Sequence, residues 1–138
     1  MSVESFDPGA QTAQLTPAAL ERLLEVGSAL DAEATNFADN CGLTALERSS
    51  MAGLMTAPAT DWQRAVDALN EDQIETLIRF LTLAEEGIGG WQAGDKSPVI
   101  ALAKVLKSRG SYDRSLTRWI KANSSNRFLP HGSLMDRL

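Results

Sequence analysis

The chain has little of the chemistry on which most enzymes and metal sites depend. Among its 138 residues there is one cysteine, Cys41, and one histidine, His131, and no disulfide can form within the chain. There is no zinc-ligand spacing, no serine-hydrolase elbow and no Glu-x-x-His pair of the kind that helical di-metal sites use. We therefore expect no catalytic residue, no metal and no cofactor. Cys41 is interpreted as a small buried apolar residue.

Long apolar runs are also missing. No stretch approaches the roughly 20 residues that a membrane-spanning helix needs. Residues 1–14 show neither the basic start nor the apolar run of a signal peptide. Five prolines and ten glycines are too few for a low-complexity segment. These absences lead us to expect a cytoplasmic protein with no membrane partner.

What the chain does have is a marked separation of charge. Residues 1–95 hold four Lys/Arg and sixteen Asp/Glu, a net charge of −12, whereas residues 96–138 hold nine and two, a net charge of +7. One explanation is that the two parts face each other, within a molecule or across a dimer. The other is that the basic part meets an acidic partner or nucleic acid. The overall charge of −5 disfavours non-specific nucleic-acid binding.

Apolar residues recur at helical spacing along most of the chain, and local start and stop signals divide the pattern. The predicted helices cover residues 16–41, 44–55, 60–69, 70–87, 98–108 and 113–122. The fold class we predict is all-α, a compact single-domain bundle of about five to six helices without a sheet. Residues 1–15 are expected to be a flexible arm. Residues 16–138 are expected to form one helical domain, with an acidic body at 16–95 and a basic, apolar-tailed end at 96–138.

The helix predicted at residues 70–87 has the cleanest apolar stripe. Asn70 and Gln73 are spaced as a capping box, and leucine and isoleucine follow at helical intervals. We expect this helix to be central, so that Leu77→Ala or Leu81→Ala destabilises the protein more than any change in the N-terminal arm. In the first helix, Gly27 and Ala34 are expected to let another helix approach closely.

A glycine-rich stretch around Trp91 joins the two charged parts. Gly87 is expected to end the preceding helix in the left-handed conformation, and Ser97 with Pro98 marks the next helix start. Trp91 either fills the core or meets a partner. Residues 89–97 approach the phosphate-loop pattern G-x-x-x-x-G-K-S, but an extra Asp95 precedes Lys96 and the element before it is helical. Nucleotide hydrolysis is therefore not expected.

The same stretch supports a weaker prediction, which is the binding of a small anion. Lys96 and free N–H groups after Ser97 could hold a carboxylate or phosphate.

Five apolar residues lie among the last eleven, so the tail packs either on its own domain or on a partner. His131, in a Pro-His-Gly turn, is expected to be an exposed spectator.

Two functions follow from these patterns. The first is a protein-interaction or regulatory module without catalytic activity, which binds a protein partner or itself as a homodimer. The alternative is binding of nucleic acid or a small anion by the basic C-terminal end and the stretch at residues 87–97. The residues predicted to contact a partner or anion are Trp91, Lys96, Ser97, Arg114, Arg118, Trp119, Lys121, Arg127 and His131.

Overall fold

The computed structural model describes residues 15–30 and 36–132, which form seven α-helices and no strand. The predicted all-α bundle is confirmed, with more helices than expected. Two 3₁₀ helices, Ala52–Thr56 and Gly94–Lys96, also occur. The α-helices are α1 (Pro17–Ser28), α2 (Phe37–Asn40), α3 (Ala45–Met51), α4 (Ala59–Ala65), α5 (Glu71–Gly87), α6 (Pro98–Ser108) and α7 (Arg114–Asn123).

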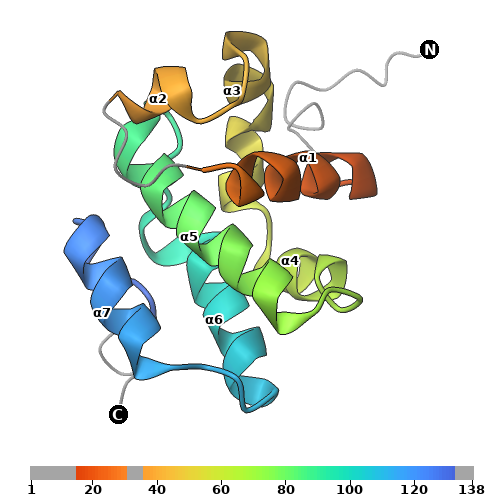
Figure 1. Cartoon of the computed structure of the whole chain (residues 1–138), viewed down its shortest axis with the longest axis vertical. Coiled ribbons are helices and arrows are strands. Elements are labelled where there is room, and N and C mark those ends of the chain that lie inside the picture. The colour runs from red at the N-terminus through yellow and green to blue at the C-terminus, as the bar shows by residue number, and fades with distance from the viewer. Residues whose placement is uncertain (1–14, 31–35, 133–138) are drawn as a thin grey trace.

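Helix α5 is the centre of the bundle, as its sequence predicts. Its start is fixed by the predicted capping box, in which the Gln73 N–H donates to the Asn70 side chain at 2.8 Å and the Asn70 N–H to the Gln73 side chain at 2.9 Å. Leu77 and Leu81 have no exposed surface. Helices α1, α2, α6 and α7 all pack on α5, which runs through the middle of the view in Figure 1.

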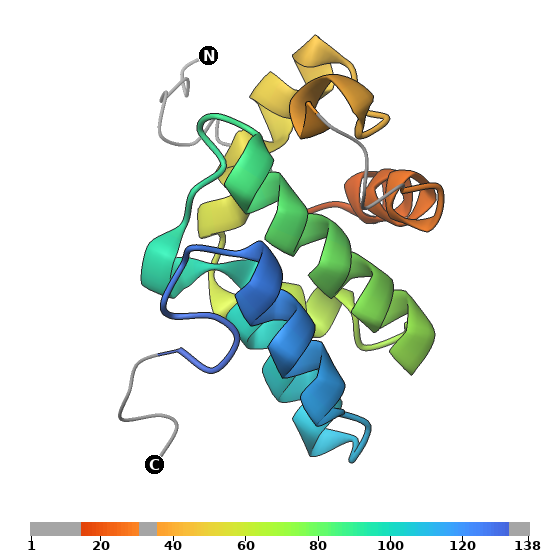
Figure 2. The ribbon, with the colours of Figure 1, turned by 60° about the vertical axis from the view of Figure 1, so that its left-hand side comes forward.

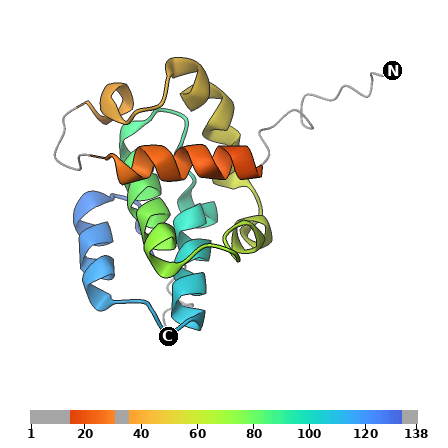
Figure 3. The same ribbon diagram turned by 45° about the vertical axis from the view of Figure 1, so that its right-hand side comes forward.

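Two helices reach α5 from different sides. Helix α1 crosses over α5 (Figure 3), and Gly27 makes this close approach feasible because a Cβ there would lie 2.9 Å from Cγ2 of Thr76. The prediction for Gly27 is confirmed, whereas Ala34 lies outside the described residues. Helix α7 lies alongside α5 (Figure 2) and buries Leu116 and Ile120.

The prediction of one helix over residues 16–41 is wrong. The helix starts as predicted, with the Thr16 hydroxyl accepting from the Ala19 N–H at 3.1 Å, but α1 ends at Ser28. A second helix, α2, begins at Phe37. Its N-cap, Asn36, has a φ of 54°, which a continuous right-handed helix does not allow. Asparagine tolerates this left-handed conformation better than most residues, so the break carries no glycine or proline signal.

The helix predicted at residues 44–55 is also divided. The Thr44–Glu47 capping box forms, but α3 ends at Met51 and the chain continues as the 3₁₀ helix Ala52–Thr56. A 3₁₀ helix has three residues per turn, so the side of the chain that faces the core changes at this point. Leu46 is 79% exposed, while Leu43 and Leu54 are buried.

The remaining helices agree more closely with their sequence signals. Helix α6 has the predicted bounds, and α7 begins after Asp113, whose side chain accepts from the Ser115 N–H at 2.8 Å. Helix α4 is shorter than predicted and ends at Ala65. No helix in the described ranges combines the length and apolar character needed to cross a bilayer. Most of the predicted N-terminal arm and the tail residues 133–138 lie outside the described residues.

Candidate functional site

The glycine-rich connection of residues 88–97, here called the hinge, is fixed to the core by its tryptophan. Trp91 is 1% exposed, and its indole N–H donates to the backbone carbonyl of Arg48 in α3 at 2.9 Å. Trp91 therefore fills the core, which is one of the two roles that the sequence left open. Although it was predicted to contact a partner or anion, it presents almost no surface in this structure.

The left-handed positions of this stretch differ from the prediction. Positive φ values occur at Gly90 (89°) and Gly94 (56°), so Gly87 does not close α5 in the left-handed conformation. Gly87 is instead required by packing. A Cβ at this position would lie 2.8 Å from the Cβ of Phe37, which is closer than side chains approach. The glycine thus allows α2 to contact α5.

Ser97 lies inside the domain, and its polar groups are already engaged. Its hydroxyl donates to the carboxylate of Glu85 and accepts from the N–H of Val99 at 3.1 Å. The next N–H, of Ile100, is bonded to the Ser97 carbonyl at 3.1 Å, and Pro98 has no N–H. The groups predicted to hold an anion after Ser97 therefore have partners within the chain.

Glu85 is a buried carboxylate that sequence reasoning missed. It is 4% exposed and accepts hydrogen bonds from Ser97, from Asn126 Nδ2 at 3.2 Å and from the Ala93 N–H at 3.4 Å. Burial raises the pKa of Glu85 above its usual value, and the three hydrogen bonds oppose that rise. Its position, four residues after Leu81 on the apolar stripe of α5, was a signal that could have identified it.

The carboxylate of Glu85 connects three parts of the chain. Its partners lie in the hinge, at the start of α6, and in the loop that follows α7. The neighbouring Glu86 reinforces this connection at the surface, because it accepts from the backbone N–H and the hydroxyl of Ser125 at 2.8 and 2.9 Å. The site is therefore a polar link between α5 and the C-terminal region.

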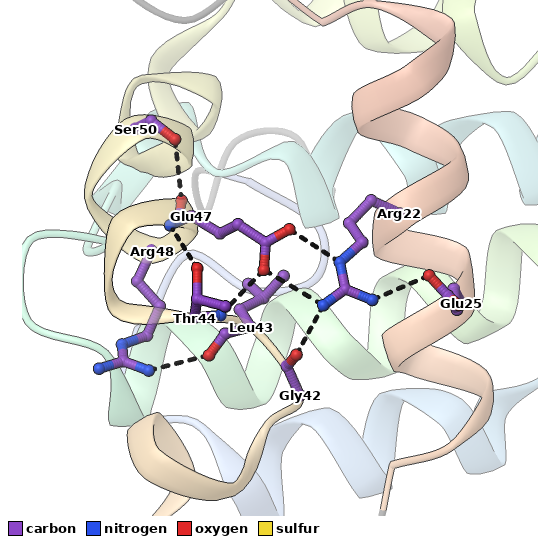
Figure 4. Close-up of polar contacts among 8 residues, drawn as sticks. All are labelled: Arg22, Glu25, Gly42, Leu43, Thr44, Glu47, Arg48 and Ser50. Carbon is purple, nitrogen blue, oxygen red and sulfur yellow. Dashed lines mark hydrogen bonds and ion pairs between the residues drawn. The ribbon is translucent and has the colours of Figure 1, made fainter.

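A second polar cluster joins α1 to α3 (Figure 4). The Arg22 guanidinium donates to both carboxylate oxygens of Glu47, at 2.9 and 3.2 Å, to Glu25 at 2.8 Å, and to the Gly42 carbonyl at 2.8 Å. The hydrogen bonds from Arg22 lower the pKa of Glu47 to about 2, and the backbone N–H of Thr44 adds to the effect. The spacing of Thr44 and Glu47 is a local capping signal, whereas the pairing of Glu47 with Arg22 joins residues 25 positions apart.

The predicted cations of α7 share one exposed face. Arg114, Arg118 and Lys121, here called the basic face, are spaced by four and three residues, which places them on one side of a helix, and all three are exposed. Trp119 is half-buried, with the guanidinium of Arg79 lying 4.8 Å from its ring centroid. Arg127 is exposed beyond the helix end. The structure thus brings together three of the nine predicted contact residues.

Among the described residues, few ion pairs join the acidic N-terminal part to the basic C-terminal part. Here the basic face makes no ion pair with the acidic helices. One C-terminal cation does: Arg109 pairs with Glu71 at 2.9 Å and also donates to the carbonyl of Leu69 at 2.6 Å. This pairing holds the end of α6 against the α4–α5 connection.

His131 was expected to be an exposed spectator, but it is half-buried and lies in a small cluster with α6. Lys107 Nζ contacts His131 Nδ1, and the rings of Tyr112 and His131 are 5.8 Å apart. Burial lowers the pKa of Lys107, with a contribution from the nearby charge of Lys104. The cluster fastens the C-terminal turn to α6. Phe128 and Leu129 also pack on the core, so the described part of the tail is held by its own domain.

Residues 15–30 and 36–132 contain no cluster of potential metal ligands. No three His, Cys, Asp or Glu side chains in these ranges are close enough to share a metal ion. Cys41 is buried, as expected. Lys96, the last of the predicted contact residues, is exposed on the hinge. No protein-family model, curated protein or solved structure matches the chain.

Proposed function

We propose that this protein is a non-catalytic interaction module whose basic face docks on an acidic surface of a partner protein. The observation that carries this proposal is the state of Arg114, Arg118 and Lys121. All three are exposed on one side of α7 and have no ion-pair partner among the described residues. Exposed cations that have no ion-pair partner among the described residues are available to bind another molecule.

The helix that carries the basic face is well anchored. Leu116 and Ile120 are buried on its other side, and Trp119 is held by Arg79. A rigid backbone lowers the conformational entropy lost on binding. Arginine is enriched at protein interfaces, and its planar guanidinium matches the geometry of a carboxylate. These properties favour recognition of Asp and Glu side chains on a folded partner.

The same observations support a protein partner over nucleic acid. The net charge of the chain is −5, and its first 95 residues carry −12, so a polyanion is repelled at long range. The aromatic ring on α7 belongs to Trp119 and is covered by Arg79, which removes it as a platform for stacking bases. A second copy of the chain meets the chemical requirement, because its own N-terminal part is acidic.

The test is charge reversal on the basic face. The variant carries Arg114→Glu and Arg118→Glu. The matched control carries Arg64→Glu and Lys104→Glu, which change the net charge equally at exposed positions elsewhere. Sedimentation velocity at low and moderate salt measures self-association, and crosslinking with mass spectrometry identifies other partners. We expect the basic-face variant, and not the control, to weaken the association at least about ten-fold, equivalent to 1.4 kcal/mol.

Two results would exclude this function. In the first, the basic-face variant and the control associate with the same partners to the same extent. In the second, a short nucleic acid binds the wild-type chain at low salt, with an affinity that falls steeply as salt rises. That result would indicate that the basic face binds nucleic acid instead of a protein.

A further inference from the structure

A pocket of about 510 Å³ lies where the hinge meets α6, on a different element from the basic face. The corner between the 3₁₀ helix Ala52–Thr56 and α4 closes one side, and Gly132 of the C-terminal turn contributes at the edge. We propose that this pocket, here called the lysine pocket, binds a small organic oxyanion, a carboxylate or phosphate ester attached to an apolar body. Its volume is in the range of ordinary small-molecule sites.

Two cations line the lysine pocket. They are Lys96, at the end of the hinge, and Lys104, in the middle of α6. Both are exposed, and neither ammonium group makes a hydrogen bond or an ion pair with the described residues. Lys104 lies six residues after Pro98, about 9 Å along α6, whereas Lys96 precedes the helix, so the two lysines line different parts of the pocket. Each can swing its flexible stem toward an anion placed between them.

The wall between the two lysines is apolar. Ile100 and Ala101 lie about one turn before Lys104 in α6 and line the same pocket. Ala57 and Pro58 line it from the opposite corner. An inorganic ion would leave these apolar side chains in contact with water, whereas a ligand with a hydrocarbon or aromatic body covers them. The combination of an apolar wall and flanking cations therefore selects an organic anion over a free one.

The pocket does not depend on the start of α6, where the N–H groups of Val99 and Ile100 already have partners. It also contains one opposing charge, because Asp95 lines it beside Lys96. Asp95 reduces the net positive charge of the pocket to one and limits the affinity for an anion. Replacement of Asp95 by a neutral residue should therefore raise the affinity for an anion, and this gain tests the contribution of a single position.

The experiment follows the methyl signals of Ala57, Ile100 and Ala101 by NMR while phenyl phosphate is added to the full chain. Lys104→Gln should weaken binding about two- to five-fold and Asp95→Asn should tighten it by a similar factor, as expected for partly exposed charges. Arg64→Gln makes the same change of charge outside the pocket and outside the basic face, and it should leave the affinity unchanged. Inorganic phosphate should bind more weakly than phenyl phosphate.

Three results would overturn the proposal. They are the absence of saturable shifts at the three pocket methyls, equal weakening by Lys104→Gln and Arg64→Gln, and equal affinity for inorganic phosphate and phenyl phosphate. The exposed positions of Lys104 and Asp95 leave the core intact, so a loss of fold does not confuse the comparison. None of these results bears on the docking proposed for the basic face.

Discussion

Trp91 and Arg48 are joined by a hydrogen bond of 2.9 Å from the indole N–H to the backbone carbonyl, across 43 positions of sequence. The guanidinium of Arg48 in turn donates to the Leu43 carbonyl at 3.0 Å, so one residue fastens both the hinge and the start of α3. A connection with glycines at 89, 90 and 94 would otherwise sample many conformations. Burial of the indole selects one of them.

Replacement of Trp91 separates the hydrogen bond from the ring that fills the core. Trp91→Phe keeps an apolar ring but leaves the Arg48 carbonyl without its donor, and we expect a loss of about 1–3 kcal/mol in the free energy of unfolding. Trp91→Ala also opens a cavity and should cost about 3–5 kcal/mol. Urea unfolding followed by circular dichroism measures both. The control is Trp119→Phe, on a half-exposed ring, and an equal loss in the two Phe variants would contradict the role given to this bond.

Gly87 and Gly89 form a matched pair for a test of packing. A Cβ at Gly87 would meet the Phe37 Cβ at 2.8 Å, whereas no atom lies within 4 Å of a Cβ at Gly89. Gly87→Ala should destabilise the protein by about 1–3 kcal/mol because α2 must move away from α5. Gly89→Ala should be neutral, or stabilising by up to about 1 kcal/mol, because it restricts the unfolded chain. Thermal unfolding compares them, and equal stability of the two variants would show that α2 is not held against α5.

Elements with local start signals could be predicted from the sequence. The caps at Asn70, Ser97 and Asp113 are encoded within three residues of each helix start, and α5, α6 and α7 begin where these signals indicate. The break before α2 depends on the left-handed conformation of Asn36, which no neighbouring residue requires. The end of α3 depends on the change to 3₁₀ geometry after Met51. This change accompanies the burial of Leu43 and Leu54, which no local sequence signal predicts.

The candidate site shows the same division between local and distant causes. The spacing of Arg114, Arg118 and Lys121 is a property of one helix, and the sequence alone places them on one face. The engagement of Ser97 depends on Glu85, which is twelve residues away and on another helix. Lys104 could not be assigned to a pocket before the corner at Pro58 was placed opposite α6.

The pairing of Glu47 with Arg22 predicts an unusually acidic carboxyl group. Its pKa is lowered to about 2 in the folded protein, against 4.5 for an ordinary glutamate, so the pairing contributes stability above pH 4.5. That contribution is lost as the pH falls through about 2. NMR titration of the side-chain carboxyl carbon should give this midpoint directly. Arg22→Gln should move the midpoint upward, toward 4.5, whereas Arg64→Gln should not. A midpoint near 4.5 in the wild-type chain would rule out the ion pair in solution.

Burial of Glu85 predicts a pH dependence of the opposite sign. Because burial raises its pKa, the folded state holds a proton more tightly than the unfolded state, and ionisation of Glu85 costs stability. This cost appears as the pH rises above about 4.5 and is complete above the folded-state pKa. Glu85→Gln cannot ionise, and its amide can still pair with Ser97 and Asn126. The free energy of unfolding of the variant relative to wild type should therefore increase with pH across this window.

The matched control for Glu85 is its neighbour. Glu86 is exposed and bonds Ser125 at the surface, so Glu86→Gln removes one carboxylate of the same charge from the same turn of α5 while Glu85 stays buried and ionisable. The charge of Glu86 is the smallest of the causes acting on the pKa of Glu85. Urea unfolding at several pH values compares the three proteins, with a slope of at most about 1.4 kcal/mol per pH unit from one group. Parallel curves for wild type and Glu85→Gln would mean that the hydrogen bonds from Ser97, Asn126 and Ala93 balance the effect of burial, and a difference that falls with pH would mean that they outweigh it. A rising difference for Glu85→Gln alone would show that burial dominates, and that the link between α5 and the C-terminal region is strongest when this carboxyl group is protonated.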